Sequence, residues 1–197
     1  MSDPRPVSRR PNGRGTETAD VGRPAADEVQ PLGIQVSAGT ASGPTTLAAF
    51  DGALRVAGVA NFNLIKLSSI APPGSVVSVL EAGAAPGGTW GDRLYVVLAE
   101  ERVETHNEEA WAGIGWTQER RTGRGVFVEH HGNSRHRVDA DITASLNDLV
   151  AGRPGMAFTP VQRLVIGATC VDEPVCALVV AVFGSEPWPA EATIDLR

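Results

Sequence analysis

Residues 61–73 read NFNLIKLSSIAPP, an apolar run that contains two adjacent serines and ends at two prolines. The β-branched and aromatic residues of this run predict a strand over 61–70, and the prolines end it because proline cannot donate to a ladder. Neighbouring strand residues face opposite sides of a sheet, so Ser68 and Ser69 are expected to present one hydroxyl to each face. Taken alone, such a pair is most simply two ordinary hydroxyls near a strand end.

A strand and a helix are expected before this run. The strand is centred on Ile34 and Val36, and the helix begins with a threonine N-cap after Pro44. Gly58 has the place of the C′ residue that follows a helix. Apolar residues recur with helical period at Leu47, Phe50, Leu54 and Ala57. Asp51 is expected on the same face of the helix as these apolar residues, where a carboxylate needs a partner.

Strands predominate after the prolines. An amphipathic helix is expected over residues 138–150, with Asp139 and Asp141 in its first turn, and Gly152 ends it. Further strands are expected at 75–80, 94–99, 111–117, 125–130, 163–169 and 176–183. These strands are apolar enough for helices to cover one face of each sheet. The sequence therefore predicts the α/β class, as an αββα-type sandwich of mainly antiparallel sheets with flanking helices.

The chain of 197 residues suits one domain of ordinary size preceded by a tail. Residues 1–32 are rich in proline, glycine and arginine and have no apolar period, so they are expected to be disordered. The domain is expected to cover residues 33–197. No run approaches the roughly 20 apolar residues that cross a bilayer, and no apolar segment typical of a signal peptide follows the first arginines.

The net charge of −6 belongs to the domain, because the tail contains five arginines and five acidic residues. An acidic domain disfavours nucleic acid, whose phosphates require a basic surface. It mildly favours a cationic substrate through long-range attraction. The two cysteines, Cys170 and Cys176, are too few for a disulfide scaffold, and we expect a cytoplasmic protein with reduced thiols.

Three motifs at fixed spacing carry a resemblance to a known family. They are FDGAL at residues 50–54, NFNL at 61–64 and SSIAPP at 68–73. In this combination they resemble the FDGAL, N-x-N-L and SSI-x-PP segments of the pyruvoyl-dependent arginine decarboxylases. The resemblance is dense over residues 45–73 and looser but collinear over most of the remaining domain, with the tail outside it.

The resemblance implies that the chain cleaves itself between Ser68 and Ser69. The Ser69 hydroxyl attacks the Ser68 carbonyl carbon and turns the peptide bond into an ester. β-Elimination releases the Ser68 carboxylate and leaves dehydroalanine, and hydrolysis then releases ammonia and leaves a pyruvoyl group. Only a residue with a β-heteroatom, such as serine, permits both the attack and the elimination. The products are chains of residues 1–68 and 69–197.

The implied cofactor is this covalent pyruvoyl group, with no metal and no pyridoxal phosphate. Its ketone forms a Schiff base with the substrate's α-amine and withdraws electrons as the carboxylate leaves, which converts L-arginine to agmatine and carbon dioxide. The carbanion then needs a proton from a carboxylic acid in a partly dry site. Glu129, which shares a face with Phe127 at the end of an apolar strand, matches the family's glutamate. The nearby histidines match no common metal spacing: His130, His131 and His136.

Asn63 matches the second asparagine of the N-x-N-L segment, which assists processing and the site in the family. Six residues of straight strand span about 20 Å, so Asn63 and Ser69 share a site within one subunit only if the chain bends. A site between neighbouring subunits avoids this separation, and the resemblance implies a homotrimer. Asp51 matches the aspartate of FDGAL, whose carboxylate is expected to face the substrate's guanidinium. The other interpretation of Asp51 is a helix-capping or structural ion pair.

Two alternatives remain open at this point. In the first, the pyruvoyl group acts on another amino acid, such as histidine or lysine, since the stretch 81–123 matches the family only loosely. In the second, the chain is an unprocessed trimeric relative with a binding or regulatory role. The second is disfavoured because the full set of expected site residues is present: Ser68, Ser69, Asn63 and Glu129.

Overall fold

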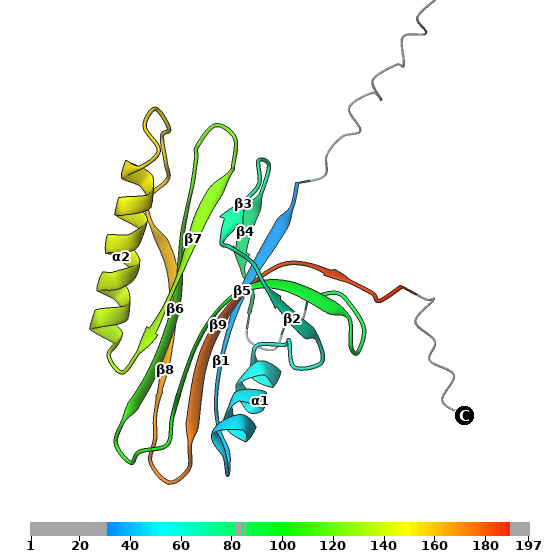
Figure 1. Ribbon diagram of the computed structural model, residues 1–197, viewed down its shortest axis with the longest axis vertical. Coiled ribbons are helices and arrows are strands. Elements are labelled where there is room, and N and C mark those ends of the chain that lie inside the picture. The colour runs from blue at the N-terminus through cyan, green and yellow to red at the C-terminus, as the bar shows by residue number, and fades with distance from the viewer. Residues whose placement is uncertain (1–30, 82–83, 85, 190–197) are drawn as a thin grey trace, which may run out of the picture.

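The computed structural model describes residues 31–81, 84 and 86–189 (Figure 1). The tail expected over residues 1–32 therefore lies outside the described residues, except for its last two. In chain order the elements are β1 (Gly33–Ser42), α1 (Thr46–Val56), β2 (Asn63–Lys66), β3 (Ile70–Ala71), β4 (Val76–Val79), β5 (Arg93–Val103), β6 (Glu109–Gln118), β7 (Gly125–Gly132), α2 (Arg135–Ala151), β8 (Gln162–Thr169) and β9 (Val175–Glu186).

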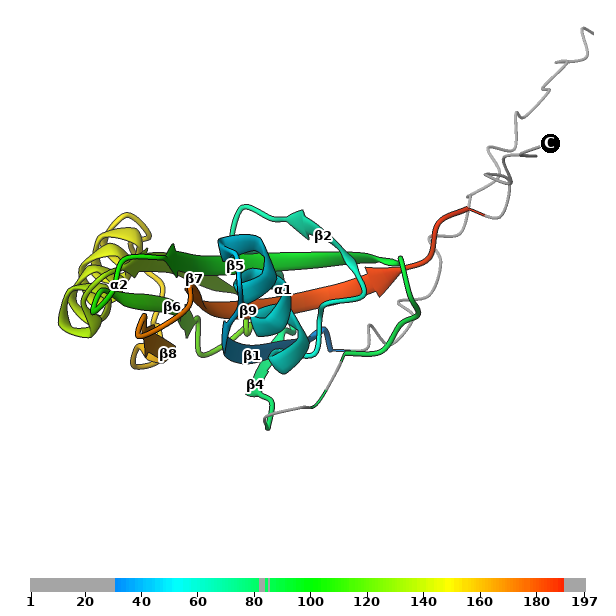
Figure 2. The same cartoon turned by 90° about the horizontal axis from the view of Figure 1, so that it is seen from below.

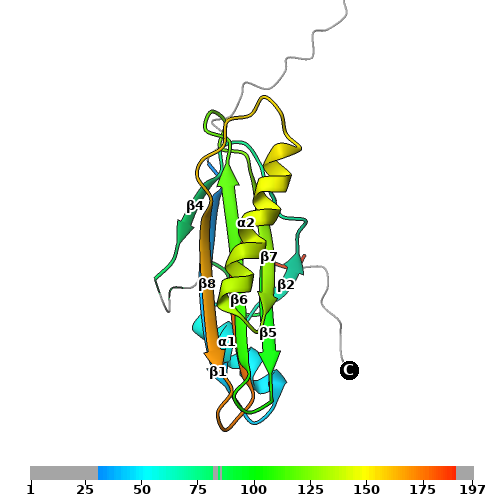
Figure 3. The same ribbon diagram turned by 90° about the vertical axis from the view of Figure 1, so that its left-hand side faces the viewer.

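Two sheets face one another, and one helix covers the outer face of each. Five strands form the first sheet in the order β2-β5-β9-β1-β4, and four form the second in the order β3-β7-β6-β8. Helix α1 packs on β1 and β9 of the first sheet, and α2 packs on β6 and β7 of the second (Figures 1 and 3). The pairs β1–β4 and β2–β5 are parallel, and the other named pairs are antiparallel. The predicted αββα-type sandwich of mainly antiparallel sheets is confirmed.

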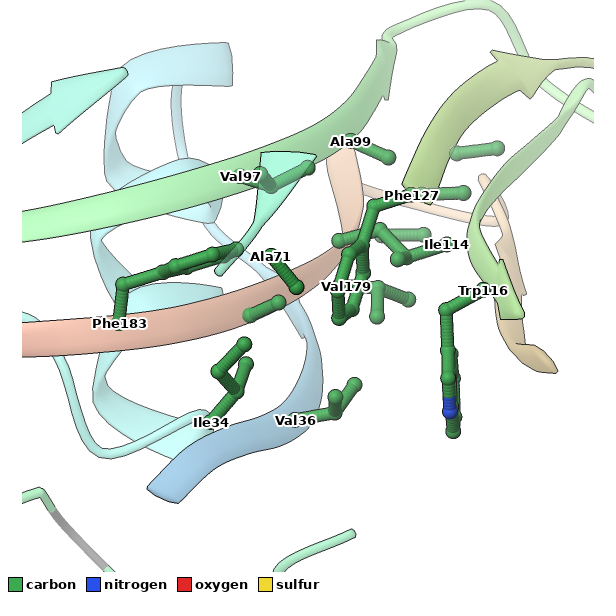
Figure 4. Packing of buried hydrophobic residues seen from close by; sticks show 14 of the residues in the cluster. Ile34, Val36, Ala71, Val97, Ala99, Ile114, Trp116, Phe127, Val179 and Phe183 are labelled. Atoms are coloured by element: carbon green, nitrogen blue, oxygen red, sulfur yellow. The ribbon is translucent and has the colours of Figure 1, made fainter. Parts of the chain in front are cut away.

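The core between the sheets is built from alternate residues of the facing strands. Phe127 of β7 lies at its centre, with ring centroids 6.1 Å from Trp116 and 5.5 Å from Phe183 (Figure 4). Val97 of β5 and Ala71 of β3 are buried beside these rings. Burial of apolar area contributes about 25 cal/mol per Å². This shared core therefore holds β3 and β7 against the five-stranded sheet.

Helix α1 begins and ends where the sequence predicts. The Thr45 hydroxyl accepts a hydrogen bond from the Ala48 N–H at 3.1 Å, and Gly58 follows the helix with a φ of 80°. The predicted apolar stripe is wrong in part, because Leu47 is 66% exposed. Small residues let the helix approach β1 closely. The buried side consists of Ala49, Gly52, Ala53, Leu54 and Ala57.

The helix and strand boundaries differ from expectation in two places. β1 runs on to Ser42, six residues past Val36, on which the expected short strand is centred. Helix α2 begins at Arg135, so Asp139 and Asp141 lie in its second turn, where each pairs with the arginine four residues before it. Neither helix in the described part of the chain is long and apolar enough to cross a membrane.

The single strand predicted over residues 61–70 is wrong. Asn63–Lys66 pairs with β5 in the five-stranded sheet, whereas Ile70–Ala71 pairs with β7 in the four-stranded sheet. The chain between them crosses from one sheet to the other at residues 67–69. Both halves of the apolar run pack against hydrophobic cores, which explains why the run is continuous in sequence. The two halves nevertheless satisfy their backbone hydrogen bonds in different sheets.

Gly39 of β1 is a point of close contact with α1. A Cβ built there would overlap the Ala53 carbonyl oxygen and approach the Ala57 amide nitrogen to 2.9 Å. Because these backbone atoms cannot rotate away, Gly39→Ala should lower the free energy of unfolding by roughly 1–3 kcal/mol, measured by chemical denaturation. Gly33→Ala is the matched control in the same strand, since its new Cβ meets no atom within 4 Å. Equal unfolding midpoints for the two variants would contradict this packing.

Candidate active site

The peptide bond between Ser68 and Ser69 lies between two backbone hydrogen bonds that belong to different sheets. Before it, the Leu67 N–H donates to the Val96 carbonyl of β5 at 2.8 Å. After it, the Ser69 carbonyl accepts from the Phe127 N–H of β7 at 2.9 Å. The crossing is therefore short and is held at both ends.

Ser69 has a backbone conformation that serine rarely adopts. Its φ is 66°, in the left-handed region, which costs a non-glycine residue roughly 1–2 kcal/mol. The register of β5 also shifts between Tyr95 and Val96, directly beside the Leu67 anchor. Irregularities of both kinds are common at functional sites. The strained torsion is adjacent to the bond that joins Ser69 to the exposed Ser68.

Glu129 of β7 lies beside the second serine. The Ser69 hydroxyl donates a hydrogen bond to Glu129 Oε2 at 3.0 Å. Glu129 follows Phe127 by two residues, and Phe127 faces the core between the sheets, so the pleat directs both side chains toward that face. The structure therefore brings together two predicted site residues that are 60 positions apart. The Glu129 side chain is exposed in the single chain.

Asn63 begins β2 and contacts a turn instead of the serines. Its Nδ2 donates to the Gly91 carbonyl at 2.6 Å, and its backbone N–H donates to the Asp92 carbonyl at 2.8 Å. Asn63 and Gly91 are among the residues that line a surface cavity of about 200 Å³. The expected separation of Asn63 from Ser69 assumed a straight strand, and the crossing at residues 67–69 overturns that assumption.

Asp51 lies in α1, apart from the serine pair. Its Oδ2 accepts from Arg55 Nη1 at 2.9 Å, one helical turn away, and its side chain is 51% exposed. The prediction that Asp51 lies on the buried side of the helix is wrong, because the small residues form that side. Helix α1 covers the outer face of the five-stranded sheet, while Glu129 belongs to the other sheet. Within one chain, α1, which carries Asp51, and β7, which carries Glu129, lie in different layers (Figure 1).

A buried carboxylate fixes the turn that leads into β7. Glu119 accepts hydrogen bonds from the Thr122 hydroxyl and from the Thr122 N–H, the latter at 2.9 Å. The hydroxyl contact is the main reason why the pKa of Glu119 lies below its usual range. Arg124 Nε lies 3.9 Å from the same carboxylate oxygen. A charged side chain therefore holds the start of the strand that carries Glu129.

Other titratable groups of the two sheets have structural surroundings. In the described part of the chain, no three histidine, cysteine, aspartate or glutamate side chains come close enough to hold a metal ion. His130 contacts Ser145 Oγ at 2.9 Å, and His131 contacts Glu101 at 2.6 Å. Cys176 is a free thiol, and burial raises its pKa to about 12, so it is unreactive at neutral pH.

Sequence reasoning missed the main-chain partners of the serine segment. The carbonyl of Val96 and the N–H of Phe127 act through the backbone, which every residue type supplies. The left-handed torsion of Ser69 also leaves no signal, since glycine or asparagine is the usual residue in that region. The turn that anchors Asn63 had a weak signal in the sequence, because a glycine such as Gly91 often marks a tight turn. The structure has this turn, with a Gly91 φ of 87°.

A serine pair on the crossing between two sheets, with a carboxylate against the second hydroxyl, fits the class of pyruvoyl-dependent decarboxylases. The chain belongs to the pyruvoyl-dependent arginine decarboxylase family, whose model matches residues 33–187. The resemblance read from the three motifs is therefore confirmed.

Curated relatives extend this match. The "Pyruvoyl-dependent arginine decarboxylase" of Halobacterium salinarum is 32% identical over 161 residues, which are 78% of this chain and 96% of that protein. The protein of the same name from Thermoplasma volcanium is 36% identical over 102 residues, 51% of this chain and 56% of the relative. That of Methanocaldococcus jannaschii is 54% identical over 43 residues, 22% of this chain and 26% of the relative.

Proposed function

We propose that this chain cleaves itself between Ser68 and Ser69 and, once cleaved, decarboxylates L-arginine to agmatine and carbon dioxide. The observation that carries the proposal is the hydrogen bond from the Ser69 hydroxyl to Glu129 at the crossing between the sheets. Family membership supports the pyruvoyl group, and the names of the curated relatives support arginine as the substrate.

In the proposed cleavage, Ser69 Oγ bonds to the Ser68 carbonyl carbon as the C–N bond between the serines breaks, giving an ester and a free amine. Loss of the Ser69 Cα proton and of the Ser68 carboxylate leaves dehydroalanine, and water then replaces its nitrogen, which departs as ammonia. The left-handed φ of Ser69 supports this step, because breaking the bond releases the strain. The anchor to Phe127 also supports it, since it holds the carbonyl that remains beside the new ketone.

The residues at the crossing fit a pyruvoyl group made from Ser69. Such a ketone supplies an electron sink for the loss of the α-carboxylate from an amino acid. Glu129 is proposed to give a proton to the substrate's α-carbon, and its contact with the side chain from which the ketone would be made supports this role. Asn63, in the role taken from the family, assists the cleavage and the site.

The substrate's guanidinium is proposed to pair with Asp51 from a neighbouring subunit of a homotrimer. The Asp51 carboxylate already binds one guanidinium, that of Arg55, at 2.9 Å. Asp51 and Glu129 lie in different layers of one chain, which supports a site that takes them from two subunits. A subunit interface would also exclude water from Glu129, which the single chain leaves exposed.

Two further points belong to the proposal. Residues 33–197 are proposed as the catalytic domain, and the family match begins at Gly33, the first residue of β1. The cytoplasm is proposed as the compartment, and the free thiols of Cys170 and Cys176 support this placement.

The first test is the release of amine and carbon dioxide from a panel of amino acids. Wild-type protein should convert arginine to agmatine faster than it converts lysine or histidine, and Ser69→Ala should be uncleaved and inactive. Ser78→Ala, at an exposed position of β4, is the control and should match the wild type. Preference for lysine or histidine would overturn arginine as the substrate, and activity of Ser69→Ala would overturn the pyruvoyl group.

Glu129→Gln separates cleavage from decarboxylation. The amide fills the same space but has no acidic proton to deliver, so kcat should fall about 10²- to 10⁴-fold while the chain still divides at Ser69. Steady-state kinetics on the divided protein, with the extent of cleavage measured on a gel, distinguish the two steps. Unchanged kcat in fully cleaved Glu129→Gln protein would rule out Glu129 as the proton donor.

Asp51→Asn should weaken substrate binding. Loss of a charge-assisted hydrogen bond to the guanidinium should raise KM for arginine about tenfold or more and leave cleavage intact. Asp148→Asn, at an exposed position of α2, is the matched control and should leave KM unchanged. If both variants bind arginine as the wild type does, Asp51 is a structural residue paired with Arg55.

A further inference from the structure

The Gly91 carbonyl joins Asn63 to the end of the last strand. It accepts one hydrogen bond from Asn63 Nδ2 at 2.6 Å and a second from the indole Nε1–H of Trp188 at 2.9 Å. A carbonyl oxygen has two lone pairs, so these two donors complete its capacity. Asn63 and Trp188 are therefore held by the same oxygen atom.

The turn around Gly91 fixes the direction of this carbonyl. Gly91 has a φ of 87°, and its own N–H donates to the Asn61 carbonyl at 2.7 Å. Within the turn, the Thr89 N–H donates to Asp92 Oδ2 at 2.8 Å. The Asn63 N–H donates to the Asp92 carbonyl at 2.8 Å. Side-chain and main-chain bonds thus attach Asn63 to neighbouring residues of the same turn.

Arg93 and its partners hold Trp188 over the turn. The Arg93 guanidinium lies 4.9 Å from the centroid of the Trp188 ring, and its Nη2 donates to the Pro187 carbonyl at 2.9 Å. The same nitrogen lies 3.2 Å from Glu186 Oε2, which also accepts from the Tyr95 hydroxyl at 2.7 Å. The contact with Glu186 is the main reason why the pKa of Tyr95 is raised, so the hydroxyl remains a donor.

The contacts of Gly91, Arg93 and Trp188 lie at one end of the five-stranded sheet, and this end extends beyond α1. In Figure 2 the ends of β5 and β9 run on together past α1, away from the four-stranded sheet. Arg93 is the first residue of β5 and Glu186 the last of β9. Trp188 follows two residues later, one position beyond the stretch that the family model matches. Trp188 therefore lies outside the stretch that matches the family, although the turn that it contacts lies inside that stretch.

We infer that Trp188 is a positioning residue for Asn63: its indole N–H holds the Gly91 carbonyl that orients the Asn63 amide. An exposed asparagine without such an anchor would populate several rotamers, and fixing one of them for the reaction would cost conformational entropy. With Nδ2 bound to Gly91, the Asn63 Oδ1 has a fixed direction. The inference rests on the proposed function, in which Asn63 assists cleavage at the serine pair.

Cleavage would place the partners of this network in different chains. Asn63 belongs to residues 1–68, whereas Gly91, Arg93 and Trp188 belong to residues 69–197. The same bonds would then hold Asn63 in place after the chain divides. Loss of the Trp188 N–H should therefore affect both the rate of cleavage and the later kcat.

Trp188→Phe tests the inference, because phenylalanine keeps an aromatic ring at this position and removes the N–H donor, together with part of the ring area, a loss that the control below shares. Pulse-labelled full-length chain, followed on a gel, should divide about twofold to tenfold more slowly than the wild type, the range expected for one neutral hydrogen bond. Trp90→Phe is the matched control, since Trp90 adjoins the same turn and is 83% exposed. The inference fails if Trp188→Phe cleaves at the wild-type rate, or if Trp90→Phe slows cleavage equally.

A double-mutant cycle shows whether Trp188 acts through Asn63. In the Asn63→Ala background, Trp188→Phe should have no further effect on the cleavage rate, whereas independent roles would give additive losses and overturn the inference. A second readout does not require cleavage: in uncleaved Ser69→Ala protein, Trp188→Phe should accelerate hydrogen exchange of the Asn63 side-chain amide, and unchanged exchange would also overturn it. A wild-type chain that never divides would instead refute the proposed function.

Discussion

The backbone at Ser68 and Ser69 is bound to both sheets at once, and the proposed chemistry depends on that constraint. The Leu67 N–H is held by one sheet and the Ser69 carbonyl by the other, at 2.8 and 2.9 Å. The aromatic core under Phe127 keeps the two sheets in a fixed relation, so Ser69 retains a φ of 66° although serine disfavours it. The packing of the core thereby holds the backbone at Ser69 in a strained conformation, next to the bond whose cleavage we propose.

The same topology explains how a site would survive the loss of that bond. Residues 1–68 contribute β1, α1 and β2, and residues 69–197 contribute the other elements. In the five-stranded sheet, β1 lies between β9 and β4, and β2 pairs with β5, so both segments form one hydrogen-bonded layer. Neither segment can leave without breaking that sheet. Asn63 and Glu129, on opposite sides of the proposed cut, therefore keep their supports.

Local patterns predicted most of the architecture, and tertiary pairing decided what they missed. The N-cap at Thr45 and the strand that carries Glu129 follow from residue preferences and period, and the structure contains both. The crossing after Lys66 could not be predicted, because an apolar run looks the same whether one sheet or two receives it. The exposed side chain of Asp51 was missed for a related reason: α1 packs against β1 mainly through alanine and glycine, and Leu47, which the predicted stripe included, lies outside the buried side. For the candidate site, residue types and spacing predicted the side chains, but they could not predict the backbone groups of Val96 and Phe127 that hold the serine segment.

The most direct measurement is the intact mass of freshly folded wild-type protein, taken before and after treatment with a hydrazine. The account predicts two chains, corresponding to residues 1–68 and 69–197, of which the second has a blocked N-terminus and gains one hydrazone. A single undivided chain that does not react with hydrazine would contradict it.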